Sequence, residues 1–262
     1  MKINRIWAMV LRYVYYFRHS LDRMSDAFYW PTMDLLLWGL TSAYFRQTSS
    51  VGSSKIIMIV ISGILFWIIV WRGQYEITVN TLEEIWNKNL INIFSSPIKI
   101  SEWVSSLLII GVIKAVLSLS FASLVAYILY KINFFQFGFY IIPFGLMLIM
   151  TGWWVGFFLV GLVLRYGTKI QTFAWGGIML ISPFSAIYYP LSTLPLWAQK
   201  VAMFIPTSYI FEGTRDIINH ASFDWNKILI SFVLNIFYLT ISIIWLKKSF
   251  NKILEKGLVK VF

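Results

Sequence analysis

Charged side chains are rare in the apolar stretches of this sequence, and two of them are the first candidates for function. Asp34 lies near the start of one apolar stretch, and Lys114 lies within another. A charge inside a bilayer is costly, and it usually faces a partner of opposite charge or a polar pathway. We therefore predict an ion pair between Asp34 and Lys114. The alternative is that Asp34 reaches the membrane interface or caps a backbone group there.

Residues that commonly catalyse reactions or bind metals are scarce elsewhere in the chain. The sequence has no cysteine and two histidines, His19 and His220, so it offers neither a disulfide framework nor a thiolate metal site. An intramembrane lipid-modifying enzyme would need His, Asp or Glu side chains around one cavity, and Asp34 stands nearly alone. We predict no catalytic residue and no metal site, and the enzyme stays open as an alternative.

A further candidate is the polar segment between two apolar stretches. Residues 81–84 fit the S/T-x-x-E capping box, which predicts a helix that begins at Thr81 and continues to Phe94. A short amphipathic helix that lies along the membrane with exposed acidic residues is suited to transmit force from a partner protein; the alternative is a solvated linker helix. Its apolar face would contain Leu82, Ile85, Trp86, Leu90 and Ile93, with Glu83, Asn87 and Lys88 facing away.

The elements that position these residues follow from the hydrophobicity of the chain. Of its 262 residues, 59% are hydrophobic and 19% aromatic, with a mean hydropathy of +0.73, which indicates a membrane protein. The apolar stretches are continuous and lack the alternation of β-strands, so we predict an all-α membrane protein with six transmembrane helices. The six stretches are residues 28–45, 56–71, 103–130, 137–164, 173–189 and 228–246.

The net charge of +11 is unevenly distributed along the chain. Most Lys and Arg residues lie in the N-terminal segment, in the loops after the second and fourth stretches, and in the tail, residues 247–262. Cytoplasmic loops of membrane proteins carry such an excess, so both termini are predicted to be cytoplasmic. The distribution argues against a nucleic-acid partner, for which a basic patch on a soluble domain is typical.

The N-terminal residues 1–26 are predicted to form an amphipathic helix in the inner membrane interface. Their apolar residues recur at steps of three and four, and arginines occupy other faces. The helix would anchor the chain in lipid, and a second role in holding a cytoplasmic partner stays open. The apolar stripe contains Ile3, Ile6, Val10, Tyr13, Phe17 and Met24.

A segment near the C-terminus is apolar but interrupted by Pro183, Pro190, Pro195 and Pro206. Broken backbone at membrane depth is tolerated only where protein or water satisfies its amide groups. We predict a re-entrant helical hairpin over residues 190–215, which enters the membrane from the outer side and shapes a pathway. Glu212 and Arg215 are three residues apart there and could pair on one helix face.

Two segments resemble a known family. Residues 81–103, TLEEIWNKNLINIFSSPIKISEW, resemble the coupling segment of type-2 ATP-binding-cassette (ABC) export permeases. Residues 183–215, PFSAIYYPLSTLPLWAQKVAMFIPTSYIFEGTR, are similar to the outer re-entrant hairpin of that family, and the N-terminal helix matches in position. The resemblance extends over nearly the whole chain.

The resemblance implies a permease in the bacterial cytoplasmic (inner) membrane that forms a homodimer and pairs with two copies of a separate nucleotide-binding ATPase. ATP and Mg²⁺ would bind that partner, consistent with the absence of a G-x-x-x-x-G-K-[ST] phosphate loop here. The first and fifth spans would face the twin subunit. Coupling would involve Thr81, Leu82, Glu83, Glu84, Trp86 and Lys88, with Arg165 and Lys169 in a second, shorter turn over residues 165–171. The outer gate would involve Tyr188, Tyr189, Pro190, Pro206, Glu212 and Arg215.

The substrate is the least determined part of this interpretation. Few charges remain in the spans, which favours an amphipathic, lipid-linked or hydrophobic cargo. Aromatic residues such as Trp153, Trp175 and Tyr188 could stack on a sugar, or they could belong to the aromatic belts of the membrane interfaces. An ion-coupled secondary transporter is an alternative class, but it would show broken helices at corresponding positions in two repeats, and only one segment is broken here.

Overall fold

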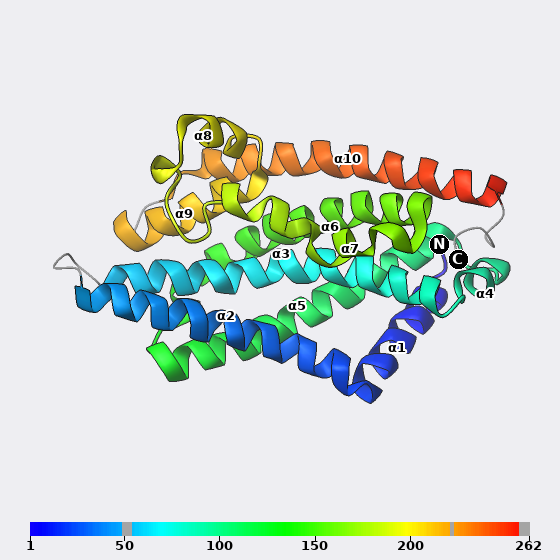
Figure 1. Ribbon diagram of the computed structural model, residues 1–262, viewed down its shortest axis with the longest axis horizontal. Coiled ribbons are helices and arrows are strands. Elements are labelled where there is room, and N and C mark those ends of the chain that lie inside the picture. Colours follow the sequence, from blue (N-terminus) through cyan, green and yellow to red (C-terminus); the bar gives the residue numbers. More distant parts are fainter. Residues whose placement is uncertain (49–53, 221–222, 257–262) are drawn as a thin grey trace.

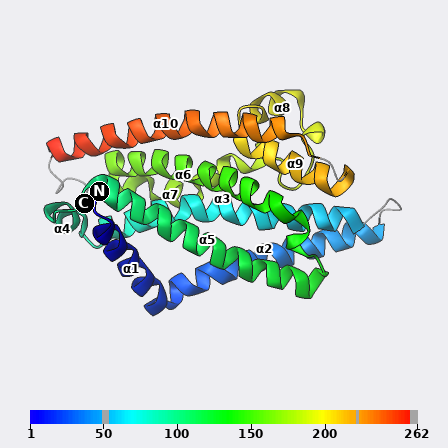
Figure 2. The same cartoon turned by 180° about the vertical axis from the view of Figure 1, so that it is seen from behind.

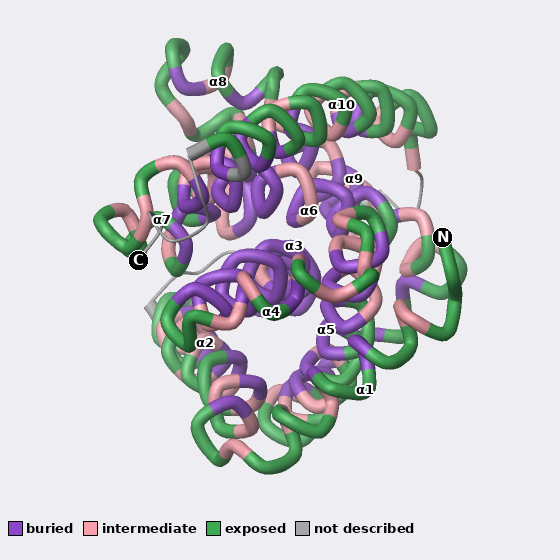
Figure 3. The backbone as a smooth tube through the Cα atoms, turned by 90° about the vertical axis from the view of Figure 1, so that its right-hand side faces the viewer, coloured by how far each residue is buried: buried purple, intermediate pink, exposed green. Residues whose placement is uncertain are grey.

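The computed structural model describes residues 1–48, 54–220 and 223–256, and every regular element in these residues is a helix. The long helices lie roughly side by side in an elongated bundle (Figure 1). α3, Ser54–Trp86, lies in the middle of this bundle, with α2 and α5 on one side and α6 and α10 on the other (Figure 3). Nearly all side chains of α3 from Val60 onward are buried, so α3 is the core on which the other helices pack.

Four helical stretches of the described residues are long and apolar enough to cross a membrane: Lys55–Trp86, Ile100–Tyr130, Phe134–Phe184 and Trp225–Ile253. They cover most or all of α3, α5 (Ile100–Tyr130), α6 (Ile141–Tyr166) and α10 (Trp225–Lys256). Four of the six predicted stretches, residues 56–71, 103–130, 137–164 and 228–246, fall within them. The all-helical fold class is confirmed, whereas the number of six spans stays a prediction.

The first predicted span, residues 28–45, lies inside α2, Leu21–Thr48, which is absent from these four stretches. α2 begins ten residues before Pro31, so this proline lies inside the helix and not in its first turn. Proline inside a helix leaves the carbonyl four residues earlier without its usual N–H donor. Here the hydroxyl of Ser118, on α5, donates a hydrogen bond of 2.9 Å to the Ala27 carbonyl oxygen. This contact explains how α2 continues through the proline.

The N-terminal region is not one helix over residues 1–26. α1, Ile3–His19, ends at Ser20, whose extended backbone (φ −112°, ψ 110°) forms a bend before α2 (Figure 1). The predicted apolar stripe also has a different role, because Val10 and Tyr13 are buried and α1 packs against α5. A row at a spacing of four residues is exposed and available to lipid: Ile3, which the predicted stripe shares, and Trp7, Leu11 and Tyr15.

The fifth predicted span, residues 173–189, is wrong as a continuous helix. The chain there forms three short pieces: α7 (Gln171–Gly176), η3 (Gly177–Leu180) and η4 (Ser182–Phe184). Two adjacent glycines, Gly176 and Gly177, disfavour a helix, and Pro183 lacks the N–H that a helix needs. The following segment includes Ala186 in the left-handed region (φ 59°). Composition predicted the apolar character of this segment, but glycine and proline determined its backbone.

Segments far apart in sequence gather at the two ends of the bundle. α1, α4 (Leu90–Ser95), the turn after α6 and the C-terminal part of α10 lie at one end (Figures 1 and 2). η1 (Phe134–Tyr140), α8 (Leu196–Ala202) and α9 (Pro206–His220) lie at the other (Figure 1). The predicted tail, residues 247–262, continues α10 as far as Lys256, and residues 257–262 lie outside the described residues.

Candidate functional site

The segment predicted as a coupling helix is built differently from the prediction. α3 continues without a break through Thr81 to Trp86, and the Thr81 hydroxyl donates to the Ile77 carbonyl oxygen at 2.7 Å. Thr81 therefore lies inside a helix and does not cap one. Inside a helix, a threonine hydroxyl can bond in this way to the carbonyl four residues earlier. A turn with Lys88 in the left-handed region (φ 52°) separates α3 from α4.

The two glutamates of this segment do not face outward. Glu84 is buried, and its carboxylate accepts hydrogen bonds from Arg12 (2.9 Å), Tyr13 (3.3 Å) and Asn89 (2.6 Å). Glu83 forms an ion pair with Arg23 of α2. The expectation that these acids are exposed is wrong, because they fasten α1 and α2 to the end of α3.

Tyr13 links this end of α3 to α5. Its hydroxyl donates to Glu84 and accepts a hydrogen bond of 3.1 Å from the indole N–H of Trp103. Burial raises the pKa of the Tyr13 phenol well above its usual range, so the phenol stays protonated as this donor requires. The exposed side chains at this end are those of Trp86, which is 43% exposed, Asn87 and Lys88.

The predicted ion pair between Asp34 and Lys114 is wrong. The Lys114 ammonium lies 2.7 Å from the Glu76 carboxylate, and both side chains are buried. Arg72 bridges the same Glu76 (3.6 Å) and Asp26 of α2 (2.8 Å). Buried charges require partners of this kind, and α3 supplies the partner because it lies between α2 and α5.

Sequence reasoning missed Asp26, Arg72 and Glu76, although a signal for two of them was present. Arg72 and Glu76 are four residues apart, the spacing of neighbours on one helix face, and Asn80 continues the row with hydrogen bonds to Arg23 (2.8 Å) and Glu76 (3.1 Å). We call Arg72, Glu76 and Asn80 the polar row of α3. Because the second apolar stretch ends at Trp71, hydropathy alone does not place this row in the same helix.

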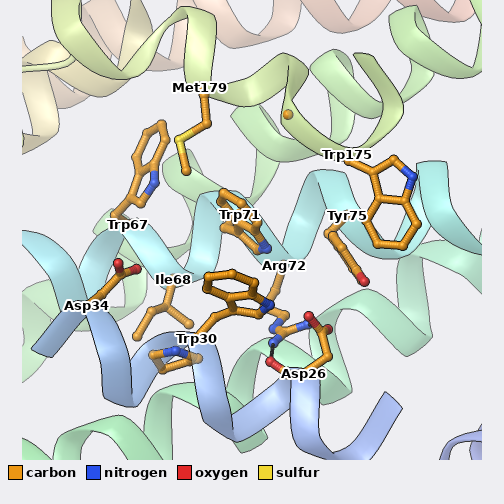
Figure 4. Close-up of a pocket in the computed structure, with 12 residues that line it drawn as sticks. Asp26, Trp30, Asp34, Trp67, Ile68, Trp71, Arg72, Tyr75, Trp175 and Met179 are labelled. Atoms are coloured by element: carbon orange, nitrogen blue, oxygen red, sulfur yellow. Dashed lines mark hydrogen bonds and ion pairs between the residues drawn. The ribbon is translucent and has the colours of Figure 1, made fainter. Parts of the chain in front are cut away.

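A second row of α3 is aromatic and consists of Trp67, Trp71 and Tyr75. Trp71 and Tyr75 directly precede Arg72 and Glu76 of the polar row in the sequence. This row lines a pocket of about 360 Å³ between α2, α3 and the broken segment after α6, residues 171–184 (Figure 4). Asp34 projects from α2 into this pocket, on the side where Trp67 lies (Figure 4). The lining is completed by Asp26, Trp30, Pro31, Ile68, Arg72, Trp175, Gly176 and Met179.

Most of the residues predicted for the outer gate are close to one another in the structure. The Arg215 guanidinium is buried and contacts Glu212 (3.0 Å), the Tyr189 carbonyl oxygen (2.7 Å) and the Ala186 carbonyl oxygen. Glu212 also accepts a hydrogen bond of 2.8 Å from the backbone N–H of Leu191. The contact predicted from the spacing of Glu212 and Arg215 therefore forms, and it ties α9 to the irregular segment 186–191.

The other three predicted gate residues are placed around this tie. The ring of Tyr188 stacks on Trp38 of α2, with ring centres 4.3 Å apart. Pro190 is the extended residue before η5 (Leu191–Thr193). Pro206 begins α9 at some distance along the chain, and its carbonyl oxygen accepts a hydrogen bond of 2.9 Å from Ser231 of α10.

Comparison with known proteins assigns this architecture. The family model of the ABC-2 family transporter proteins matches residues 32–246. The chain belongs to this family. It is a multi-pass membrane protein and a permease subunit of an ABC transporter, and the family implies a partner subunit that binds ATP. A search of curated proteins finds no match.

The second predicted coupling turn of this ABC-2 permease lies at the same end of the bundle as α4. Arg165 is half-buried, and its guanidinium donates to Ser249 (2.9 Å) and lies 3.9 Å from the ring centre of Trp245 on α10. Lys169 is exposed in η2, Gly167–Ile170. Of the two basic residues, Lys169 is the more exposed.

Proposed function

We propose that this chain forms, as a homodimer, the path of an ATP-driven exporter for an amphipathic, lipid-linked or hydrophobic substrate. Two copies of the ATP-binding subunit would supply the energy, with ATP and Mg²⁺ bound there. The observation that carries this proposal is the continuity of α3. One 33-residue helix includes both the aromatic row at the pocket and the Trp86 end beside α4, so a displacement of that end would be passed to the pocket.

The surface proposed to contact the ATP-binding subunit consists of Trp86, Asn87 and Lys88, together with α4 and Lys169. The end of the bundle that carries this surface also carries α1, while α8 and α9 lie at the opposite end (Figure 1). Glu84 would act from beneath the surface, because it connects the end of α3 to Arg12 and Tyr13 of α1. Force on α4 would then reach α1 and α3 together.

The proposed export path lies next to α2. This helix is long enough to span a membrane but is not among the four apolar stretches, which suits a helix that faces a second subunit and a path more than lipid. Its exposed side chains include Trp30, Met33 and Leu37. The outer closure would be the tie between Arg215, Glu212 and segment 186–191, which must loosen when cargo leaves.

The proposed orientation places both termini in the cytoplasm of a bacterial cell, and it can be tested with two matched variants. Lys88 and Lys131 are both exposed lysines with a left-handed backbone (φ 52° and 57°). Lys88 follows α3 and Lys131 follows α5, at opposite ends of the bundle. The chain has no cysteine, so K88C and K131C each introduce a unique thiol. A membrane-impermeant maleimide should label K131C in intact cells and K88C only in inverted vesicles.

The partner contact is tested with the same two variants. A photoactivatable crosslinker on K88C should capture the ATP-binding subunit in membranes that contain both proteins, and the same reagent on K131C should not. ATP hydrolysis by the purified complex should fall when K88C is modified and stay unchanged when K131C is modified. Capture from K131C alone, or transport by the chain without an ATP-binding subunit, would contradict the proposal.

A further inference from the structure

The pocket between α2, α3 and the broken segment has an unbalanced charge. Three charged residues line it, Asp26, Arg72 and Asp34. Asp26 and Arg72 neutralise each other through a contact of 2.8 Å, whereas Asp34 forms no ion pair with any residue that the structure describes. One carboxylate therefore faces the pocket without a counter-charge, in surroundings where such a charge is costly.

The remaining lining favours a cation over other ligands. Five aromatic rings line the pocket, and the face of an aromatic ring attracts a cation placed over it. The pocket walls already show this contact, because the Arg72 guanidinium lies 5.5 Å from the ring centre of Tyr75. An anion would be repelled by Asp34, and the exposed lining of the pocket is mostly apolar, which leaves few polar atoms for a sugar to bond.

The size and access of the pocket suit a small amphipathic molecule. Its volume of about 360 Å³ is at the lower end of the range for drug-sized ligands. Trp30 and Trp175 are 53% and 41% exposed, so the rings at its rim can be reached from outside the chain. Trp67, which is 4% exposed, forms part of the inner wall near Asp34 (Figure 4).

We propose that this pocket binds an amphipathic organic cation, with Asp34 as its counter-charge and the rings of Trp30, Trp67 and Trp71 around its charged group. This inference rests on the proposed export function, because it names the substrate class of the path next to α2. Asp34 is thus a binding residue, and its lack of a partner within the chain is the condition for that role.

The test uses two water-soluble probes that share a benzyl group and differ in charge, benzyltrimethylammonium and benzylsulfonate. Binding of each radiolabelled probe is measured with the full chain in lipid nanodiscs. The cation should bind saturably and the anion should not. Asp34→Asn should weaken cation binding at least about tenfold, since it removes a close opposite charge, and Trp30→Leu should weaken it about threefold.

Asp22→Asn is the matched control, because Asp22 lies on the same helix but is exposed and does not line the pocket. It should bind the cation as the unchanged chain does, and all variants should elute as the unchanged chain does in gel filtration. The inference is overturned if the cation does not bind saturably, if the anion binds equally well, or if Asp34→Asn binds the cation normally.

A second measurement separates this inference from the proposed export function. In the complex with the ATP-binding subunit, benzyltrimethylammonium should stimulate ATP hydrolysis, and Asp34→Asn should require a higher concentration for the same effect. If the complex couples ATP hydrolysis to another cargo while the cation fails to bind, the cation inference is wrong and the export function stands. If the cation binds but no ATP-binding subunit associates, the export function is wrong and the binding site stands.

Discussion

The two rows of α3 show how one helix can serve structure and binding on adjacent faces. In the polar row, Arg72, Glu76 and Asn80 all have partners on α2, on α5 or within the row itself. Beside the aromatic row, Asp34 of α2 has no ion-pair partner among the described residues. Buried charges with partners hold helices together, and removal of one partner is strongly destabilising. A carboxylate without a partner contributes little to that stability and remains available to a ligand.

The largest expected effect comes from Glu76, which neutralises Lys114 and Arg72. Glu76→Gln leaves a buried ammonium without its counter-charge, so we expect a loss of about 3 kcal/mol in the free energy of unfolding. The measurement is equilibrium unfolding in detergent micelles. Lys114→Met in the same chain should restore part of the loss, and purely additive damage in the double variant would contradict the role of the pair.

The next effect concerns the close contact of Gly152 on α6 with the backbone of α3. A methyl group on Gly152 would meet the Val70 carbonyl oxygen at 2.5 Å, so Gly152→Ala should destabilise the chain by about 2 kcal/mol. Gly176→Ala is the control, since a methyl group there meets nothing within 4 Å. Equal thermal stability of the two variants would show that α3 and α6 are not held this closely.

A smaller effect is expected at Tyr13, which joins α1 to both α3 and α5. Tyr13→Phe removes the donor to Glu84 and leaves the Trp103 indole N–H without its acceptor, at a cost of about 1 to 2 kcal/mol. If the proposed function holds, coupling of ATP hydrolysis to transport should weaken as well. Thermal unfolding and ATPase assays of the same preparation measure the two effects, and unchanged values in both would contradict the link.

The smallest effect on stability is expected for Asp34→Asn. Because Asp34 has no ion-pair partner among the described residues, the substitution should change the free energy of unfolding by less than about 0.5 kcal/mol. Unfolding of this variant beside Glu76→Gln makes the comparison of the two rows direct. A loss as large as that of Glu76→Gln would mean that Asp34 is a structural charge after all.

The comparison also shows which site residues could be predicted. Glu212 and Arg215 were found from their spacing because they are neighbours on one helix, and their contact forms. Glu84 and Lys114 were recognised as important, but their partners were not. Those partners lie on other helices, Arg12 and Tyr13 on α1 and Glu76 on α3. The spacing of Arg72, Glu76 and Asn80 indicates a row on one helix face only if the helix of the second span continues past Trp71.

The all-helical class, most of the apolar stretches and the broken segment with Pro183 and Pro190 could be predicted from residue types alone, because hydrophobic content and proline act on the local chain. Packing between helices was needed to establish which face of α1 meets protein, that α3 continues through Thr81, and that Lys114 pairs with Glu76 and leaves Asp34 in a pocket. These outcomes depend on which helices approach one another. A local pattern gives the same capping box and the same amphipathic stripe whether the neighbour is lipid, water or another helix.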